Sequence, residues 1–155
     1  MITKHGNVTN ANMDDIQSLI EQIRPEDRQE IEDISGQSVE ENFQFALRFG
    51  EPCLALRTLN DNDLVGILTV CPTGNRCGVI AMSGTVLLEK NEKAFLRGSR
   101  DVLKYLDQSY DLLYNVCDAR NSTHHKWLKW LGFKFLALKN YGHANVPVYE
   151  FARLK

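Results

Sequence analysis

The stretch from Asp118 to Phe135 constrains the fold more than any other part of the chain. An apolar run at 112–117 precedes it and has the length and composition of a buried strand. A polar turn suited to a helix start follows, and four residues then recur at the spacing of one helical face: His124, Trp127, Leu128 and Leu131. Gly132 ends this helix, and two phenylalanines then alternate with a lysine, as in a strand with one buried face. The pattern predicts a strand–helix–strand unit whose helix ends in a Gly-Phe pair.

This unit resembles the last part of the fold of the GNAT acetyltransferase family. In that fold an Asn opens a helix beside the acyl-coenzyme A cleft, and the matching positions here are Asn121, Gly132 and Phe133. The second half of the chain is also similar to a smaller group, the GNAT-like internal virion protein A of short-tailed phages. That similarity rests on FLRGSR at 95–100, LLYN at 112–115, DARN at 118–121, WLKWLGF at 127–133 and VYEF at 148–151. The resemblance spans residues 43–151.

The elements around this unit predict the rest of the fold. Three helices between residues 14 and 49 precede three strands, at 53–58, 64–70 and 78–82, and a helix at 91–107. Ile2 and Val8 mark a further short strand, and an alternating strand at 146–154 ends the order. Antiparallel hairpins followed by a βαβ crossover predict an α/β fold with a largely antiparallel mixed sheet and helices on both faces. No repeat or linker interrupts the chain, so residues 1–155 are predicted to form a single GNAT-like domain.

The relative direction of two of these strands tests the resemblance to the GNAT fold. The strands at 78–82 and 112–117 are joined by a helical crossover, so they are expected to be adjacent and parallel. The resemblance implies that the corresponding strands of the GNAT fold splay apart to admit the cofactor.

A strongly acidic helix is predicted at 26–34, with Pro25 at its first position. It carries five acidic residues: Glu26, Asp27, Glu30, Glu32 and Asp33. A charge run of this kind is usually a solvated helix face, and that is the interpretation we favour. A docking surface for a partner is the alternative.

Composition and charge narrow the class of partner. Apolar residues make up 43% of the chain, charged residues 25%, and the net charge is −2, so nothing points to nucleic acid as a partner. No apolar run approaches the ~20 residues needed to cross a bilayer. The N-terminus lacks the apolar core of a signal peptide, so secretion is not expected. The four cysteines show no C-x-x-C spacing, and no metal site is predicted.

The resemblance implies acetyl-CoA as a cofactor, held by its pyrophosphate on backbone N–H groups of a glycine-rich loop with the pattern R/Q-x-x-G-x-G/A. Glycines let the backbone approach the phosphates closely, and the helix that follows favours anions. The matching stretch, 83–93, has one glycine, at its beginning, and a Val-Leu-Leu run where the loop should lie. Gly98 comes too late. The sequence therefore predicts that acetyl-CoA is not bound through such a loop.

Side chains offer an alternative phosphate site. Four basic residues follow at steps of 3, 4 and 3 along one helical flank: Lys90, Lys93, Arg97 and Arg100. They are candidate cofactor-binding residues together with Asn121, which by resemblance holds the pantetheine arm. A solvated basic face, and for Asn121 a helix cap, are the other interpretations.

The catalytic positions of the family are only partly filled. In many members a Tyr seven residues after the Asn protonates the departing thiolate, and here that position is Leu128, which has no proton to give. His124 is the candidate acid on this helix, although its apolar flank also suits a hydrogen-bonded core histidine. Asp118, at the end of its strand, is the candidate general base, or else ties the turn to the helix start.

Two functional hypotheses follow, and fold alone does not choose between them. The favoured one is a GNAT-fold, virion-associated phage protein, made in the infected cell, with a degenerate acyl-CoA cleft. Its expected partners are other phage or host proteins, and its expected location is the virion or the host cytoplasm. The alternative is an active acyl-CoA-dependent N-acetyltransferase acting on a primary amine.

Overall fold

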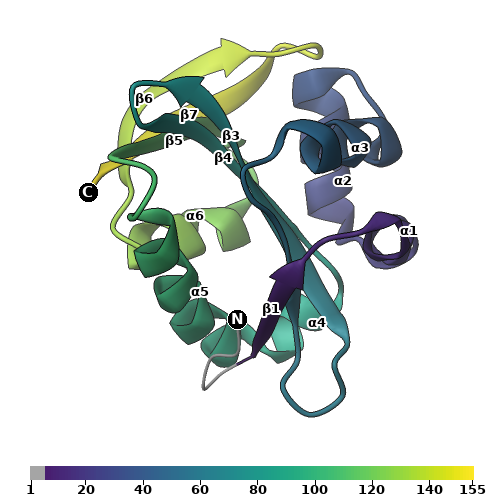
Figure 1. The fold of residues 1–155 in the computed structure, drawn as a ribbon. Coiled ribbons are helices and arrows are strands. Elements are labelled where there is room, and N and C mark those ends of the chain that lie inside the picture. Colours follow the sequence, from purple (N-terminus) through teal and green to yellow (C-terminus); the bar gives the residue numbers. More distant parts are fainter. Residues whose placement is uncertain (1–5) are drawn as a thin grey trace.

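A computed structural model describes residues 6–155 and shows a seven-stranded sheet with helices on both sides (Figure 1). The elements are β1 Asn7–Asn10, α1 Met13–Gln22, α2 Pro25–Ser35, α3 Val39–Phe49, β2 Cys53–Arg57, β3 Leu64–Gly74, β4 Cys77–Gly84, α4 Leu87–Lys90, α5 Glu92–Leu106, β5 Leu112–Asp118, α6 Ser122–Trp130, β6 Lys134–Tyr141 and β7 Val146–Leu154. The strand order is β1-β2-β3-β4-β5-β7-β6. The predicted contribution of Ile2 to a first strand lies outside the described residues.

The parallel pairing of β4 and β5 confirms the expected topology. The two strands pair only at their beginnings, where Cys77 to Val79 lie opposite Leu112 to Tyr114. All other neighbours in the sheet are antiparallel. Beyond this short ladder β4 stays paired with β3, and β5 with β7, so the sheet divides along the line between them. This is the mixed, largely antiparallel sheet that the sequence predicted.

The core lies in two apolar clusters, one on each face of the sheet. Figure 1 shows α1, α2 and α3 on one side and α5 and α6 on the other. Trp127, Leu131 and Phe133 are buried in the cluster beneath α5 and α6, as expected for the helix stripe and the Gly-Phe pair. Ile16 and Phe43 belong to the second cluster, beneath α1 and α3. The 3,4-spaced apolar residues of each amphipathic helix thus meet the sheet.

Helix starts follow the sequence signals closely. Ser38 and Glu41 form the predicted capping box of α3, and Pro25 opens α2. The apolar flank predicted for α3 is only partly correct, because Phe45 and Phe49 are about half exposed and pack against each other on the outside. Only one side of the 11-residue helix can pack on the sheet, so apolar residues on its other sides stay exposed.

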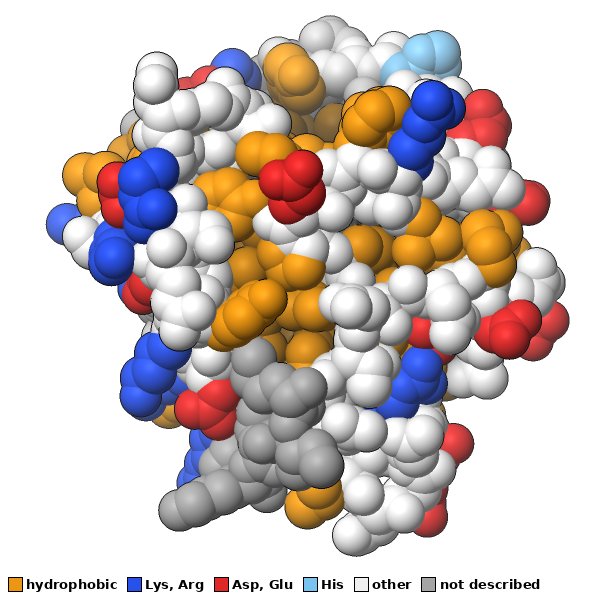
Figure 2. Space-filling model, in the orientation of Figure 1, with side chains coloured by type: hydrophobic (Ala, Val, Ile, Leu, Met, Phe, Trp, Pro, Cys, Tyr) orange, Lys and Arg blue, Asp and Glu red, His pale blue; other side chains and the backbone are white. Residues whose placement is uncertain are grey.

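The predicted helix at 91–107 and the predicted strand after Gly132 also differ in detail. A four-residue helix, α4, precedes α5. In β6 only Phe135 is half-buried, whereas Leu136 and Leu138 are exposed, because β6 is the edge strand of the sheet. Figure 2 shows hydrophobic side chains at the centre of the visible face and charged ones mainly toward its margins. No helix within residues 6–155 has the length and hydropathy of a membrane-crossing segment.

Candidate functional site

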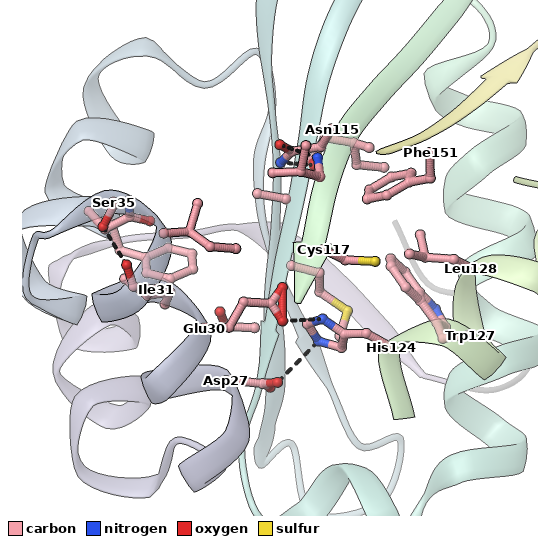
Figure 3. A pocket seen from close by; sticks show the side chains of 18 residues that line it. Asp27, Glu30, Ile31, Ser35, Asn115, Cys117, His124, Trp127, Leu128 and Phe151 are labelled. Atoms are coloured by element: carbon pink, nitrogen blue, oxygen red, sulfur yellow. Dashed lines mark hydrogen bonds and ion pairs between the residues drawn. The ribbon is translucent and has the colours of Figure 1, made fainter. Parts of the chain in front are cut away.

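A cavity of about 240 Å³ lies where β4 and β5 part. Its walls come from both sides of the sheet, with α2 and α3 on one side, α6 on the other, and the parting strands between them (Figure 3). Most lining side chains are apolar, among them Ile31, Phe43, Met82, Trp127 and Phe151. Among the polar side chains that line it, Asp27, Glu30 and His124 point toward one another.

His124 faces two carboxylates of α2. Its Nε2 lies 3.1 Å from Oδ1 of Asp27, and its Nδ1 lies 3.3 Å from Oε2 of Glu30. Asn121 joins the same pair, since its Nδ2 donates to Asp27 Oδ1 at 2.9 Å and to Glu30 Oε2 at 2.8 Å. Asn121 and His124 are one helical turn apart, so the first turn of α6 holds both carboxylates. Asp27 is 1% exposed and His124 6%, which makes this a buried network.

Asp27 is also held from its own side of the molecule. Nη1 of Arg24 donates to Asp27 Oδ1 at 2.8 Å, and the backbone N–H of Gly84 donates to Asp27 Oδ2 at 2.8 Å. Arg24 is itself buried. Arg24 also lies 3.5 Å from Oε2 of Glu26 and 3.6 Å from Oε1 of Glu89, both exposed carboxylates. Each carboxylate of the buried network therefore has a cationic partner, Arg24 or protonated His124.

The network fixes the charge of its members. Burial alone would lower the pKa of His124, but the negative charges of Glu30 and Asp27 outweigh it and raise this pKa to about 10. Burial alone would raise the pKa of Asp27, but the charges of His124 and Arg24, with the Gly84 hydrogen bond, lower it to about 2. An imidazolium that keeps its proton this firmly is a poor general acid at neutral pH. The geometry thus favours the paired core histidine over the acid role predicted for His124.

A metal ion fits this network poorly. One ligand atom from each of Asp27, Glu30 and His124 lies within 4.8 Å of the others, which is close enough to surround a cation. Both ring nitrogens of His124 face carboxylates, however, and the guanidinium of Arg24 already pairs with Asp27. A metal would have to displace the imidazole proton and lie beside the guanidinium of Arg24, which places two positive charges close together in a buried site.

Within the stretch that matches the family's phosphate loop, 83–93, the five amides from Gly84 to Leu88 are not free. Each amide is already bonded: Gly84 to Asp27 Oδ2 at 2.8 Å, Thr85 to Val65 O at 2.8 Å, Val86 to Gln22 O at 2.9 Å, Leu87 to Thr85 Oγ1 at 3.3 Å and Leu88 to Thr85 O at 3.0 Å. Leu88 also fills the space beside Gly84, where a Cβ would meet its Cδ2 at 2.7 Å. Because a phosphate cradle needs unsatisfied N–H groups, these residues do not fit the pyrophosphate of coenzyme A.

The basic candidates lie apart from the cavity. Lys90 belongs to α4, while Lys93, Arg97 and Arg100 follow on α5, and all four are exposed. None of them lines the cavity between β4 and β5. Arg100 stacks on the ring of Trp130, with its Cζ 3.9 Å from the ring centroid. The structure therefore does not bring the basic flank together with Asn121, and an anion site on this flank stays a prediction.

Asp118 ties the turn after β5 to the start of α6, which was the alternative to its role as general base. Its Oδ1 accepts from the backbone N–H and from Nε of Arg120, both at 2.9 Å, and its Oδ2 accepts from Nη2 of Arg120 at 2.7 Å. Burial would raise the pKa of Asp118, but these hydrogen bonds lower it overall. Asp118 is absent from the cavity lining, so its role as a general base stays a prediction without geometric support.

Asn121 and Leu128 complete the comparison with the expected site. Asn121 opens α6 as predicted, but its side chain makes no capping hydrogen bond, and its Nδ2 donates instead to Asp27 and Glu30. Its Oδ1 is buried without a hydrogen-bond partner. Leu128 does line the cavity and is buried, so an apolar side chain stands where the family's acid is expected.

The sequence analysis missed the carboxylates of α2. Asp27 and Glu30 were interpreted as parts of a solvated face, which is wrong for Asp27 and only partly right for Glu30, since the first is buried and the second half-buried. Their i, i+3 spacing on the side of Ile31 and Ile34 was the available signal. A second cavity, of about 390 Å³, lies between α5 and the β1–β3 region, and no candidate site residue lines it.

Comparisons with known proteins give a fold and no closer relative. No family model and no curated protein matches the sequence. Among solved structures, a GNAT-family acetyltransferase from Bacillus anthracis is similar with a TM-score of 0.73 and 12% identity, over 99% of this chain and 97% of that chain. The spermidine N-acetyltransferase from Vibrio cholerae, solved in complex with CoA and spermine, gives a TM-score of 0.71 and 12% identity, over 98% and 96%.

The ribosomal-protein-S5-alanine acetyltransferase from Vibrio fischeri gives a TM-score of 0.70 and 13% identity, over 99% of this chain and 95% of that chain. At identities this low the likeness is one of fold. It extends over nearly the whole length of both chains and agrees with the parallel β4–β5 pair and the division of the sheet beyond it. The chain has the fold of the GNAT acetyltransferases.

Proposed function

We propose that this protein is a GNAT-fold binding protein that has lost acetyl-CoA-dependent catalysis and works through contacts with other proteins. The observation that carries the proposal is the set of five consecutive amides, Gly84 to Leu88, that are all bonded within the chain. A cradle for pyrophosphate needs those groups free. Leu128 in the cavity wall and the firmly protonated His124 support the same conclusion.

The partner and the location rest on the sequence resemblance alone. A role as a component of a phage particle, made in the host cytoplasm and assembled with other phage or host proteins, is the specific form of the proposal. The similarity of residues 43–151 to internal virion proteins supports it.

An active acyl-CoA-dependent N-acetyltransferase is the second candidate. The division of the sheet between β4 and β5 favours it, together with the cavity that lies there. The solved acetyltransferases of the same fold add support, one of them in complex with CoA. In this protein, phosphate binding would have to use side chains such as Arg97 and Arg100 in place of backbone N–H groups.

Isothermal titration calorimetry with acetyl-CoA separates the two candidates. The proposal expects no binding heat at millimolar cofactor. A micromolar isotherm would favour the enzyme, and the Arg97→Ala, Arg100→Ala double variant then tests how the phosphates are held. Each charged phosphate contact is worth ~1.5–3 kcal/mol, so this variant should bind about tenfold more weakly or worse. The Lys126→Ala variant, on the exposed side of α6, is the control.

A further inference from the structure

The contact between α2 and α6 is made by charged and polar side chains. Asp27, Glu30 and Asp33 follow one another at steps of three along α2. Their partners come from one short segment of the β5–α6 junction: His124, Asn121 and Arg120. The outermost rung joins Nη2 of Arg120 to Oδ2 of Asp33 at 2.8 Å. The three acidic residues thus form a ladder that holds α2 against the start of α6.

Apolar packing contributes little to the position of α2. Asp27 is its only buried residue. Ile31 packs on the edge of the second core cluster, and Ile34 is half-buried. Both isoleucines line the cavity together with Asp27 and Glu30, so α2 forms one wall of it. A helix that buries so little apolar surface depends on its polar contacts for its position.

The two ends of α2 are anchored differently from its middle. At the C-terminal end, the β6–β7 turn donates to α2 carbonyls, with the N–H of His143 on Ile34 O at 3.1 Å and the N–H of Ala144 on Asp33 O at 2.8 Å. At the N-terminal end, Arg24 and Gly84 hold Asp27. Between these anchors, the side chain of Glu30 pairs with His124 and Asn121, and nearer the C-terminal end the side chain of Asp33 pairs with Arg120, just before α6.

We propose that α2 is a movable wall of the cavity, held close to α6 by a latch, the pairs that Glu30 and Asp33 make with His124, Asn121 and Arg120. Release of these pairs lets this part of α2 shift away from α6 and widens the cavity toward Cys117. The width of the cavity is then set by charge, and a partner that supplies competing charges at α2 or at Arg120 widens it. The latch does not depend on whether the cavity accepts acetyl-CoA.

Cys117 provides a local probe of this widening. Its thiol lines the cavity and is 2% exposed. Cys53, on β2 in the other core cluster, is also buried and does not line the cavity, so it reports unfolding of the whole protein. Labelling by N-ethylmaleimide, resolved by peptide mass spectrometry, follows both thiols in the same sample.

The test compares a latch variant with a charge-matched control. Glu30→Gln with Asp33→Asn removes the two latch charges and keeps side-chain size. Glu32→Gln with Glu92→Gln removes the same charge at two exposed sites whose side chains make no hydrogen bond or ion pair among residues 6–155. The latch variant should raise the Cys117 labelling rate about tenfold or more, since charged hydrogen bonds are lost. The control should leave it unchanged, and Cys53 should stay protected in both.

The single variant Asp33→Asn is a milder test in case the double variant does not fold. It weakens the partly exposed Arg120 pair and the exposed hydrogen bond from Gln29 Nε2 to Asp33 Oδ1, so it should raise Cys117 labelling about two- to fivefold with Cys53 unchanged. Unchanged Cys117 labelling in the double variant overturns the latch. Parallel acceleration at Cys117 and Cys53 in the single variant also overturns it, because α2 would then move only when the whole protein unfolds.

Discussion

His124 on α6 and Asp27 on α2 lie across the cavity from each other, with Nε2 of the histidine 3.1 Å from Oδ1 of the carboxylate (Figure 3). Both are almost fully buried, and their pairing joins the helix that begins after β5 to the acidic helix near the N-terminus. A buried ion pair contributes little net free energy to folding, because desolvation of the two charges offsets their attraction. Removal of one partner is nevertheless costly, since it leaves the other charge buried and uncompensated, and this cost can be measured.

Replacement of His124 by Gln should lower the free energy of unfolding by ~3–5 kcal/mol, because Asp27 and Glu30 would keep their charges in a buried site. Thermal or urea denaturation measures the change. Lys126→Gln is the matched control, since it removes a positive charge from an exposed position on the same helix and should change stability by less than ~0.5 kcal/mol. Equal effects of the two variants would contradict a buried imidazolium.

The contribution of His124 should depend on pH in a defined direction. Its pKa rises from 6.5 to about 10 on folding, so its stabilising effect is fully present below pH 6.5 and is lost as the pH rises through 10. The pKa of Asp27 falls from 3.8 to about 2, so its effect is present above pH 3.8 and is lost as the pH falls through 2. The stability difference between wild type and His124→Gln should therefore shrink between pH 6.5 and 10. Growth of the difference over that range would show that the histidine is neutral.

Replacement of Asn121 by Asp tests the assignment of its side chain. Asn121 donates to both Asp27 and Glu30, and a carboxylate in its place would put a third negative charge among them. We expect strong destabilisation at pH 7, because a buried charge without a partner costs several kcal/mol. Asn115→Asp, at another cavity-lining asparagine, is the comparison. If Asn121→Asp folds as stably as wild type, the amide does not hold the two carboxylates.

Trp127 should be the most costly single truncation on α6. It is 6% exposed, packs against Phe95, and its Nε1 donates to Ser99 Oγ at 3.0 Å. Trp127→Ala should cost ~3–5 kcal/mol and nearly unfold a domain of ordinary stability. Trp130→Ala, three residues on and 42% exposed, should cost much less. An unchanged melting temperature for Trp127→Ala would contradict the packing.

Local patterns were enough to predict most of the fold. The Ser38–Glu41 capping box, the α6 stripe that ends at Gly132 and the parallel β4–β5 pair were all visible in spacing and element order. The i, i+3 spacing of Asp27 and Glu30 indicated a shared helix side, but not their partners, because Asn121 and His124 lie far along the chain and an isolated acidic helix is normally solvated. Asn121 was expected to serve a cofactor or a cap, and only the tertiary structure shows the two carboxylates above it.

The closure of the Gly84–Leu88 segment is the central claim, and backbone amide chemical shifts test it most directly. We predict that the ¹H–¹⁵N signals of these five residues stay unchanged when acetyl-CoA is added to millimolar concentration, because every one of their N–H groups is already bonded within the chain. The same titration follows the amide signals of α5, and shifts at Lys93, Arg97 and Arg100 would indicate that their side chains bind the phosphates. Saturable shifts at Gly84 to Leu88 would mean that the segment opens to cradle the pyrophosphate, and they would contradict the account.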